Sequence, residues 1–229
     1  MGYKLKRIII RPNGVEQQIR PTWWQPWANT LAYYPLTSTT TVSDESWNSR
    51  DLTNNWILFW TYQGVDCAYN STAHKYLVSP TLTGTDLKTI SLWTYREWTR
   101  EVNSGYAAGF TYWAGSSSGS LYIRKESSSS FKEYYNGVSF GAALTSQWCN
   151  IVIVLWDDVK CYRNWTLIWT GAAETHNNGQ FCIFAFINNL SWFDVYYGWI
   201  SNFIVENKTR TAQEVANYFN QTKSNYWIS

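Results

Sequence analysis

The side chains that build most metal and thiol sites are scarce in this chain of 229 residues. Its two histidines, His74 and His176, lie far apart in polar segments, and its four cysteines include no Cys-x-x-Cys pair. Zinc centres draw their ligands from closely spaced pairs of these residues, so no zinc site is predicted. Strand-like runs surround three of the cysteines, which favours free, buried thiols over disulfides. The four are Cys67, Cys149, Cys161 and Cys182.

An excess of charge and long apolar runs are also missing. Lysine and arginine number 18 and aspartate and glutamate 16, which argues against nucleic acid or an anionic membrane as the main partner. No apolar stretch approaches the ~20 residues of a membrane span. The start, MGYKLKRIII, has an apolar run of only three isoleucines, so we predict no signal peptide. If the protein is located on a virion or a cell surface, it must get there by a route other than a signal peptide.

Glycine is outnumbered by tryptophan, 13 to 16, although glycine averages about 7 % of residues. Asn164-Trp165 stands between VKCY and TLI, at a hairpin apex where Asn-Gly is the favoured pair. Trp93 and Trp148 lie in apolar runs that suit a buried ring. We hypothesise that the other fourteen are glycines in the organism, through UGA codons read as glycine. The alternative is a tryptophan-rich surface that grips ligands.

Runs rich in β-branched and aromatic residues recur at hairpin spacing from Leu31 onward, with turn residues between them. They read LAYYPL, ILFWTY, KYLVS, TISLWTY, YAAGFTYW, SLYIRKE, FKEYYNG, CNIVIVLW, VKCYRN, TLIWTG, QFCIFAFI and VYYGWISNFIVE. This pattern predicts an all-β fold, a two-sheet antiparallel jelly-roll sandwich.

One short helix is predicted near the C-terminus, after a last strand that bends near Gly198. Thr211 followed by Glu214 is a capping-box signature. The expected apolar stripe of the helix consists of Ala212, Val215, Ala216 and Phe219.

The N-terminal residues 3–20 form a separate unit. Two strand-like runs flank Pro12-Asn13-Gly14, a strong turn signal, and together they predict a β-hairpin. A lone hairpin is marginal in water, so this one is expected to pack on the main domain or on a partner. The predicted organisation is a hairpin over residues 1–22, a linker over 23–30 and a sandwich domain over 31–229.

Six motifs follow one another between residues 31 and 226. They read LAYYPLTST, DESWNSRDLTNNW, KTISLWTY, SQWCNIVIV, VKCYRNWTLIWTG and GWISNFIVENKTRTAQEVANYFNQT. Their order resembles the order of motifs in the laminin-G-like domains of the concanavalin A-like lectin/glucanase superfamily. The resemblance implies a jelly-roll sandwich and commonly carbohydrate binding or adhesion, although fold alone does not fix function. The departures are mainly tryptophans where the family has glycine, at Trp47, Trp56, Trp165, Trp169 and Trp199.

Glycosidases of that superfamily carry paired carboxylates on one strand, of the kind E-x-D-x-x-E, because hydrolysis needs two carboxyl groups around the scissile bond. No such spacing occurs here. Asp157 and Asp158 are adjacent, so their side chains point to opposite faces of a strand. Neither His74 nor His176 has a nucleophile elbow nearby. The sequence therefore predicts no catalytic residues and a protein that is not an enzyme.

Some members of the superfamily bind calcium at the sandwich rim. Asp44, Asp51 and Asp66 are candidate oxygen ligands, but they lack the spacing of a calcium loop. Ordinary turn aspartates are the favoured interpretation, so no metal or other cofactor is predicted.

Tyrosines are the remaining candidates for ligand contact. Tyr112, Tyr122 and Tyr134 lie on three consecutive strand candidates and could line one exposed sheet face, where the apolar face of a sugar stacks on aromatic rings. Alternatively, they pack across strands and only cover the sandwich. The sequence thus predicts a non-catalytic, lectin-like adhesion module that binds a glycan or a cell surface. The alternative is a structural component of a phage tail or other surface appendage, docked into a larger assembly through residues 3–20.

Overall fold

The computed structural model describes residues 9–10, 16–17, 28–39, 42–46, 48–70, 72, 75–96, 109–113, 121–127, 130–135, 138–142, 146–155, 157–172, 176–188, 192–195 and 198–226. Side chains are described in these ranges except in 9–10, 16–17, 113, 121–127, 130–135, 138–142, 185–188 and 192–195.

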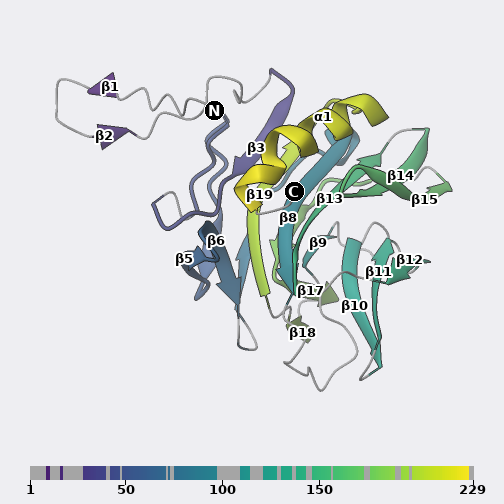
Figure 1. Cartoon of the computed structure of the whole chain (residues 1–229), viewed down its shortest axis with the longest axis horizontal. Coiled ribbons are helices and arrows are strands. Elements are labelled where there is room, and N and C mark those ends of the chain that lie inside the picture. Colours follow the sequence, from purple (N-terminus) through teal and green to yellow (C-terminus); the bar gives the residue numbers. More distant parts are fainter. Residues whose placement is uncertain are drawn as a thin grey trace.

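Two antiparallel sheets make up the body of the molecule (Figure 1). The larger has the strand order β15-β14-β13-β8-β19-β6-β5, and β3 also pairs with β19. Its strands are β3 (Thr30–Tyr34), β5 (Leu58–Tyr62), β6 (Val65–Asn70), β8 (Thr89–Arg96), β13 (Trp148–Leu155), β14 (Asp158–Arg163), β15 (Thr166–Ala172) and β19 (Gly198–Glu206). The smaller runs β4 (Thr53–Asn55), β7 (Tyr76–Val78), β16 (Gln180–Ile183), β9 (Phe110–Trp113). An all-β antiparallel sandwich is therefore confirmed.

Three shorter groups of strands accompany the sandwich. They are the sheet of β10 (Leu121–Ser127), β11 (Ser130–Tyr135) and β12 (Val138–Ala142), the pair β17 (Ala185–Asn188) and β18 (Trp192–Val195), and the pair β1 (Ile9–Ile10) and β2 (Glu16–Gln17). The last pair bears out the predicted N-terminal hairpin. The domain boundaries stay a prediction, because residues 18–27 lie outside the described residues.

The main core lies between the two sheets, where aromatic rings from both meet. Phe203 of β19 lies 5.1 Å from Phe110 of β9 and 5.2 Å from Phe181 of β16, measured between ring centroids. All four cysteines are free and buried, as the sequence predicts. Cys149 and Cys161 belong to this core, where they act as small apolar side chains.

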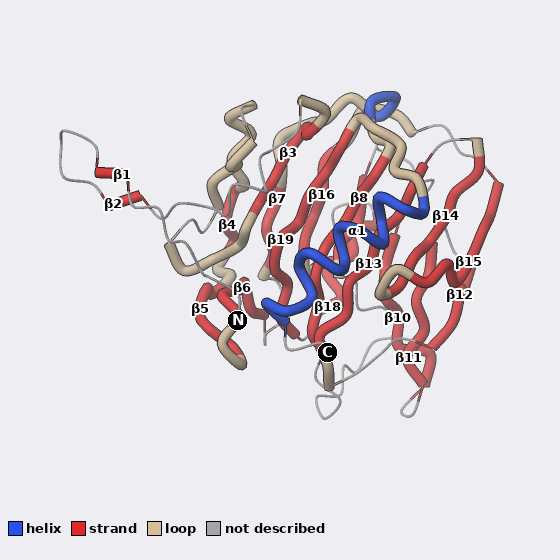
Figure 2. Tube along the Cα trace, turned by 45° about the horizontal axis from the view of Figure 1, so that its top comes forward, coloured by secondary structure: helices blue, strands red, loops and turns tan. Residues whose placement is uncertain are grey.

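The larger sheet is also covered on its outer face, by helix α1 (Ala212–Thr222) and the 3-10 turn η2 (Lys223–Tyr226) (Figures 1 and 2). Trp93 of β8 stacks on Tyr226 at 3.9 Å and on Phe219 at 5.6 Å between ring centroids. Burial on both faces explains why β8 and β13 are buried along their whole length and why β13 reads as a continuous apolar run.

The capping box of α1 is confirmed. Thr211 Oγ1 accepts a hydrogen bond from the backbone N–H of Glu214 at 3.2 Å, and Glu214 Oε2 accepts one from the backbone N–H of Thr211 at 2.9 Å. The predicted stripe is corrected: Ala212 is exposed and Ala216 only half-buried. The buried face instead begins at Val215 and follows the helical spacing of three, four and seven residues. It consists of Val215, Tyr218, Phe219 and Thr222.

Two of the tryptophans at turn positions have a left-handed backbone. Trp56 has φ of 67° and is 79 % exposed, and Trp165 has φ of 66° and is 49 % exposed. Trp169 and Trp199 instead lie within strands β15 and β19, so the turn argument does not apply to them. Trp47 lies outside the described residues.

Candidate functional site

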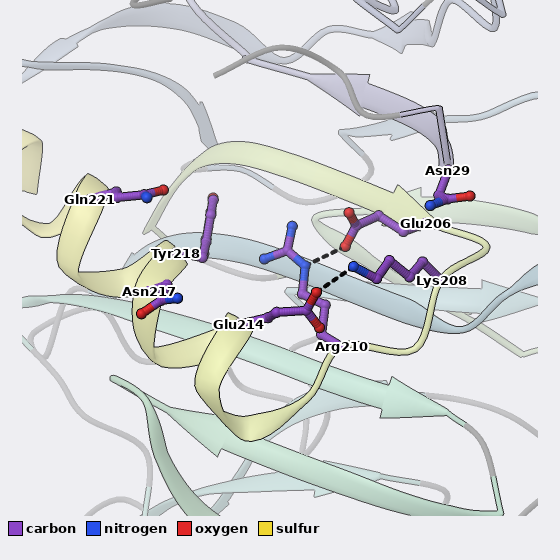
Figure 3. Close-up of a pocket in the computed structure, with 8 residues that line it drawn as sticks. All are labelled: Asn29, Glu206, Lys208, Arg210, Glu214, Asn217, Tyr218 and Gln221. Carbon is purple, nitrogen blue, oxygen red and sulfur yellow. Dashed lines mark hydrogen bonds and ion pairs between the residues drawn. The ribbon is translucent and has the colours of Figure 1, made fainter. Parts of the chain in front are cut away.

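A pocket of about 310 Å³ lies between the end of β19, the loop that follows it and helix α1 (Figure 3). Glu206 is the last residue of β19, and four residues of α1 recur at a spacing of three or four, which brings them to one face of the helix. The short loop 207–211 turns the chain back and places strand end and helix face side by side. The lining residues are Asn29, Glu206, Lys208, Arg210, Glu214, Asn217, Tyr218 and Gln221.

The floor of the pocket is a buried ion pair. Nε of Arg210 lies 2.5 Å from Oε2 of Glu206, and the two side chains are 2 % and 0 % exposed. The guanidinium carbon also lies 4.7 Å from the centre of the Tyr218 ring, a cation–π contact. Both carboxylate oxygens of Glu206 are buried, and neither has a partner in hydrogen-bond geometry among the described residues, although Oε2 contacts Arg210 in the ion pair. A buried acceptor in that state costs free energy until a donor reaches it.

Burial governs the protonation of this floor. Desolvation raises the pKa of the Glu206 carboxyl above its ordinary value, and the Arg210 guanidinium opposes part of the rise. Desolvation also raises the pKa of Tyr218 to about 12. Hydrogen bonds formed in such a water-poor place are stronger than those on an open surface.

The rim is polar and accessible. Lys208 Nζ forms an ion pair with Glu214 Oε1, and the two side chains are 44 % and 38 % exposed. The hydrogen bond from Lys208 and the backbone N–H of Thr211 hold the pKa of Glu214 below its ordinary value. The other rim residues are the exposed amides Asn29, Asn217 and Gln221. Each amide offers a carbonyl acceptor and an NH₂ donor, so the rim can bind ligands that carry hydroxyl groups.

The three predicted tyrosines do not line one exposed face. Tyr112 is 3 % exposed, and its hydroxyl donates to the backbone carbonyl of Asn177 at 2.8 Å. Its ring lies 4.9 Å from that of Phe181 in the main core, so it offers no surface to a sugar in this conformation. The backbone register pairs Tyr122 with Tyr134 across β10 and β11. Their side chains lie outside the described residues, so ligand contact there stays a prediction.

The candidate calcium ligands have other partners. Asp44 accepts hydrogen bonds from the backbone N–H groups of Tyr33, Ser46 and Arg50 at 2.8–2.9 Å and from the Ser46 hydroxyl at 2.8 Å. Asp51 Oδ1 accepts the backbone N–H of Asp44 at 2.8 Å, and Asp66 accepts the Thr61 hydroxyl. Within the described part of the chain, no group of three or more histidine, cysteine, aspartate or glutamate residues could hold a metal ion.

An aromatic row crosses the outer face of the larger sheet and ends at an exposed edge. Trp199 stacks between Tyr62 at 3.8 Å and Tyr69 at 4.8 Å, and Trp60 stacks on Tyr69 at 5.5 Å. Leu58 and Trp60 on the edge strand β5 are 52 % and 49 % exposed. Trp60 and Trp199 are among the tryptophans hypothesised to be glycine in the organism. No tryptophan is among the described residues that line the pocket beside α1.

The pocket was not predicted from the sequence, apart from the capping role of Glu214. One signal was present: Glu214, Asn217 and Gln221 are polar residues at helical spacing on one side of the predicted helix. The contribution of Glu206 and Asn29 could not be read from that spacing, because they approach the helix from β19 and from the segment before β3.

No family model matches the chain, and no curated protein sequence does either. Among the described residues, no helix has the length and apolarity that crossing a membrane requires.

Several solved structures share the fold. Domain 4 of AbnA, an extracellular arabinanase from Geobacillus stearothermophilus in complex with arabinotriose, aligns with a TM-score of 0.62 and 17 % identity over 82 % of this chain and 97 % of that domain. The Trypanosoma rangeli sialidase with 2,3-difluorosialic acid aligns with a TM-score of 0.67 and 10 % identity over 98 % of this chain and 37 % of the sialidase. The botulinum neurotoxin type G receptor binding domain aligns with a TM-score of 0.59 and 13 % identity over 85 % of this chain and 52 % of that one. The chain thus spans little more than a third of the sialidase. At identities this low, the structural alignments show a shared fold alone.

Proposed function

We propose that this chain is a non-catalytic, lectin-like adhesion module that binds a glycan in the pocket between β19 and α1. The observation that carries the proposal is the set of exposed amides at Asn29, Asn217 and Gln221 around the pocket. Ligand sites typically hold a few placed polar groups in a cavity of ~300–1,000 Å³. The volume of about 310 Å³ suits a single sugar unit.

Three further points support the proposal. The motif order assigns the sandwich, within this proposal, to the laminin-G-like branch of the concanavalin A-like superfamily. A structural neighbour was solved with arabinotriose bound, so a sandwich of this shape can present a sugar site. Both carboxylates of the pocket are paired with cations, which suits a binding site better than an acid–base pair.

The binding test uses the full chain on a panel of immobilised glycans. The double variant Asn217→Ala and Gln221→Ala removes two rim amides without touching the core. Two lost hydrogen bonds of about 1 kcal/mol each predict roughly tenfold to thirtyfold weaker binding. Asn220→Ala is the matched control, because Asn220 is an exposed residue of the same helix that does not line the pocket. Equal affinity of the double variant and the control would place the ligand elsewhere, and no binding to any glycan would refute the proposal.

Docking through the N-terminal hairpin is the second candidate function. The strands β1 and β2 form a sheet of their own and pair with no other described strand. An independent hairpin of this kind suits a docking element of a phage tail or other surface appendage. This role is compatible with glycan binding by the sandwich.

We also propose that most tryptophans other than Trp93 and Trp148 are glycine in the organism. The left-handed backbone at Trp56 and Trp165 supports glycine at those two positions, since only glycine adopts it without steric cost. The buried, stacked ring of Trp199 gives no such support. Sequencing the codons in the native gene and measuring the mass of the natively made protein distinguish glycine from tryptophan at these positions. UGG codons throughout would refute the proposal.

A further inference from the structure

The charges that line the pocket cancel. Glu206 pairs with Arg210 on the floor and Glu214 with Lys208 on the rim (Figure 3), so two carboxylates and two cations give a sum of zero. The remaining lining residues are neutral. The two carboxylates would repel an anionic ligand while the two cations attract it, and the reverse holds for a cationic ligand. Attraction and repulsion therefore largely cancel in both cases.

The buried ion pair itself offers little to a ligand. The side chains of Arg210 and Glu206 are 2 % and 0 % exposed, and both carboxylate oxygens of Glu206 are buried. The groups that a ligand can reach are the exposed amides of the rim, each of which both donates and accepts hydrogen bonds. A hydroxyl group also donates and accepts, and it brings no charge.

We propose that the pocket selects a neutral sugar unit, the hydroxyls of which bind the amides of Asn29, Asn217 and Gln221. This inference rests on the proposed function and specifies its ligand class. A uronic or sialic acid would lose the hydration of its carboxylate without a net attraction in return, although its ring would fit the same rim.

Two single variants change the charge of the pocket in opposite directions. Glu214→Gln gives a sum of +1 and keeps the capping box, which accepts glutamine as well as glutamate at this position. Lys208→Met gives a sum of −1 and keeps a similar side-chain length. Lys160→Met is the control, because Lys160 pairs with Asp158 at 3.1 Å with 39 % exposure and lies outside the pocket lining. It removes the same charge from the whole protein.

The measurement is calorimetric binding of the full chain to a neutral oligosaccharide and to the same oligosaccharide ending in an acidic sugar. We expect the wild-type chain to prefer the neutral ligand. Glu214→Gln should shift the preference toward the acidic ligand by roughly 1.5-fold to fivefold at low salt, and Lys208→Met should shift it the other way, as expected for a partly exposed charge. The control should leave the preference unchanged.

The outcomes separate this inference from the proposed function. Preference of the wild-type chain for the acidic ligand, or variants that behave like the control, overturns the charge argument and leaves glycan binding intact. Failure of both ligands and of every other glycan to bind overturns the proposed function and this inference with it.

Discussion

Trp56 and Trp165 are strained residues, because a side chain with a Cβ pays roughly 1–2 kcal/mol in the left-handed region. Both rings are about half exposed or more, so little burial offsets the strain at Trp56. Trp165 gains some packing, since its ring lies 4.5 Å from that of Phe219. The native backbone at these turns therefore suits glycine better than tryptophan.

We predict that Trp56→Gly raises the free energy of unfolding by about 0.5–1 kcal/mol, because relief of strain exceeds the entropy that glycine adds to the unfolded chain. Trp165→Gly should gain less, since it also loses the contact with Phe219. Urea unfolding of each variant measures the change. Trp199→Gly is the control within a strand and should destabilise the protein by about 3–5 kcal/mol, as expected for a buried ring. A loss of stability in Trp56→Gly would contradict the strain argument.

Tyr112 gives a prediction for alkaline pH. Burial raises the pKa of its hydroxyl from 10.0 to about 12, so the folded state holds the proton more tightly than the unfolded state. The stabilisation is fully present below pH 10 and is lost as the pH rises toward 12. Tyr112→Phe should cost about 1 kcal/mol at pH 7 through the lost hydrogen bond. Its stability should fall less steeply between pH 10 and 12 than that of the wild-type chain, and parallel pH curves would refute this role.

At the scale of elements, the loop after β3 is organised by one carboxylate. Asp44 accepts from Tyr33 in the strand and from Ser46 and Arg50 in the loop, so it fixes the loop to the sheet edge. Polar residues in turns commonly hydrogen-bond nearby backbone groups in this way. The observed partners are protein donors, and they explain the aspartate without a metal.

We predict that Asp44→Ala lowers the free energy of unfolding by roughly 2–4 kcal/mol, because several buried N–H groups lose their acceptor. Thermal and urea unfolding measure the loss, and Asp157→Ala at an exposed position is the control, with an expected change within about 0.5 kcal/mol. A chelator should leave the melting temperature of the wild-type chain unchanged. A clear drop on chelation would instead point to a calcium site.

Sequence reasoning succeeded for elements whose pattern is local. Thr211 and Glu214 predicted the start of α1, and the apolar run from Cys149 to Leu155 predicted β13. It missed β4, β6 and β12, each of which forms by pairing its backbone with a neighbouring strand. It also read QFCIFAFI as one strand, although a left-handed residue, Phe184 with φ of 71°, separates β16 from β17.

At the scale of the whole molecule, the strand pairing of the hairpin is separate from that of the sandwich. Since β1 and β2 pair only with each other among the described strands, we predict that deletion of residues 1–22 leaves a cooperatively folded domain with unchanged glycan affinity. Circular dichroism and the binding panel test this. Loss of assembly with retained binding would support the docking role, whereas an unfolded product would show that the hairpin belongs to the core.

The fold class, the position of the helix and the burial of the free cysteines follow from the sequence alone, because each depends on periodicity, capping and composition within a short stretch. The packed fold was needed to show that Tyr112 is a core residue and that Asp44 organises a loop. It also assembled Glu206, Arg210 and the amides of α1 into one pocket. Those outcomes depend on which faces of strands and helix meet, and a face acquires its partner only when segments distant in sequence pack together.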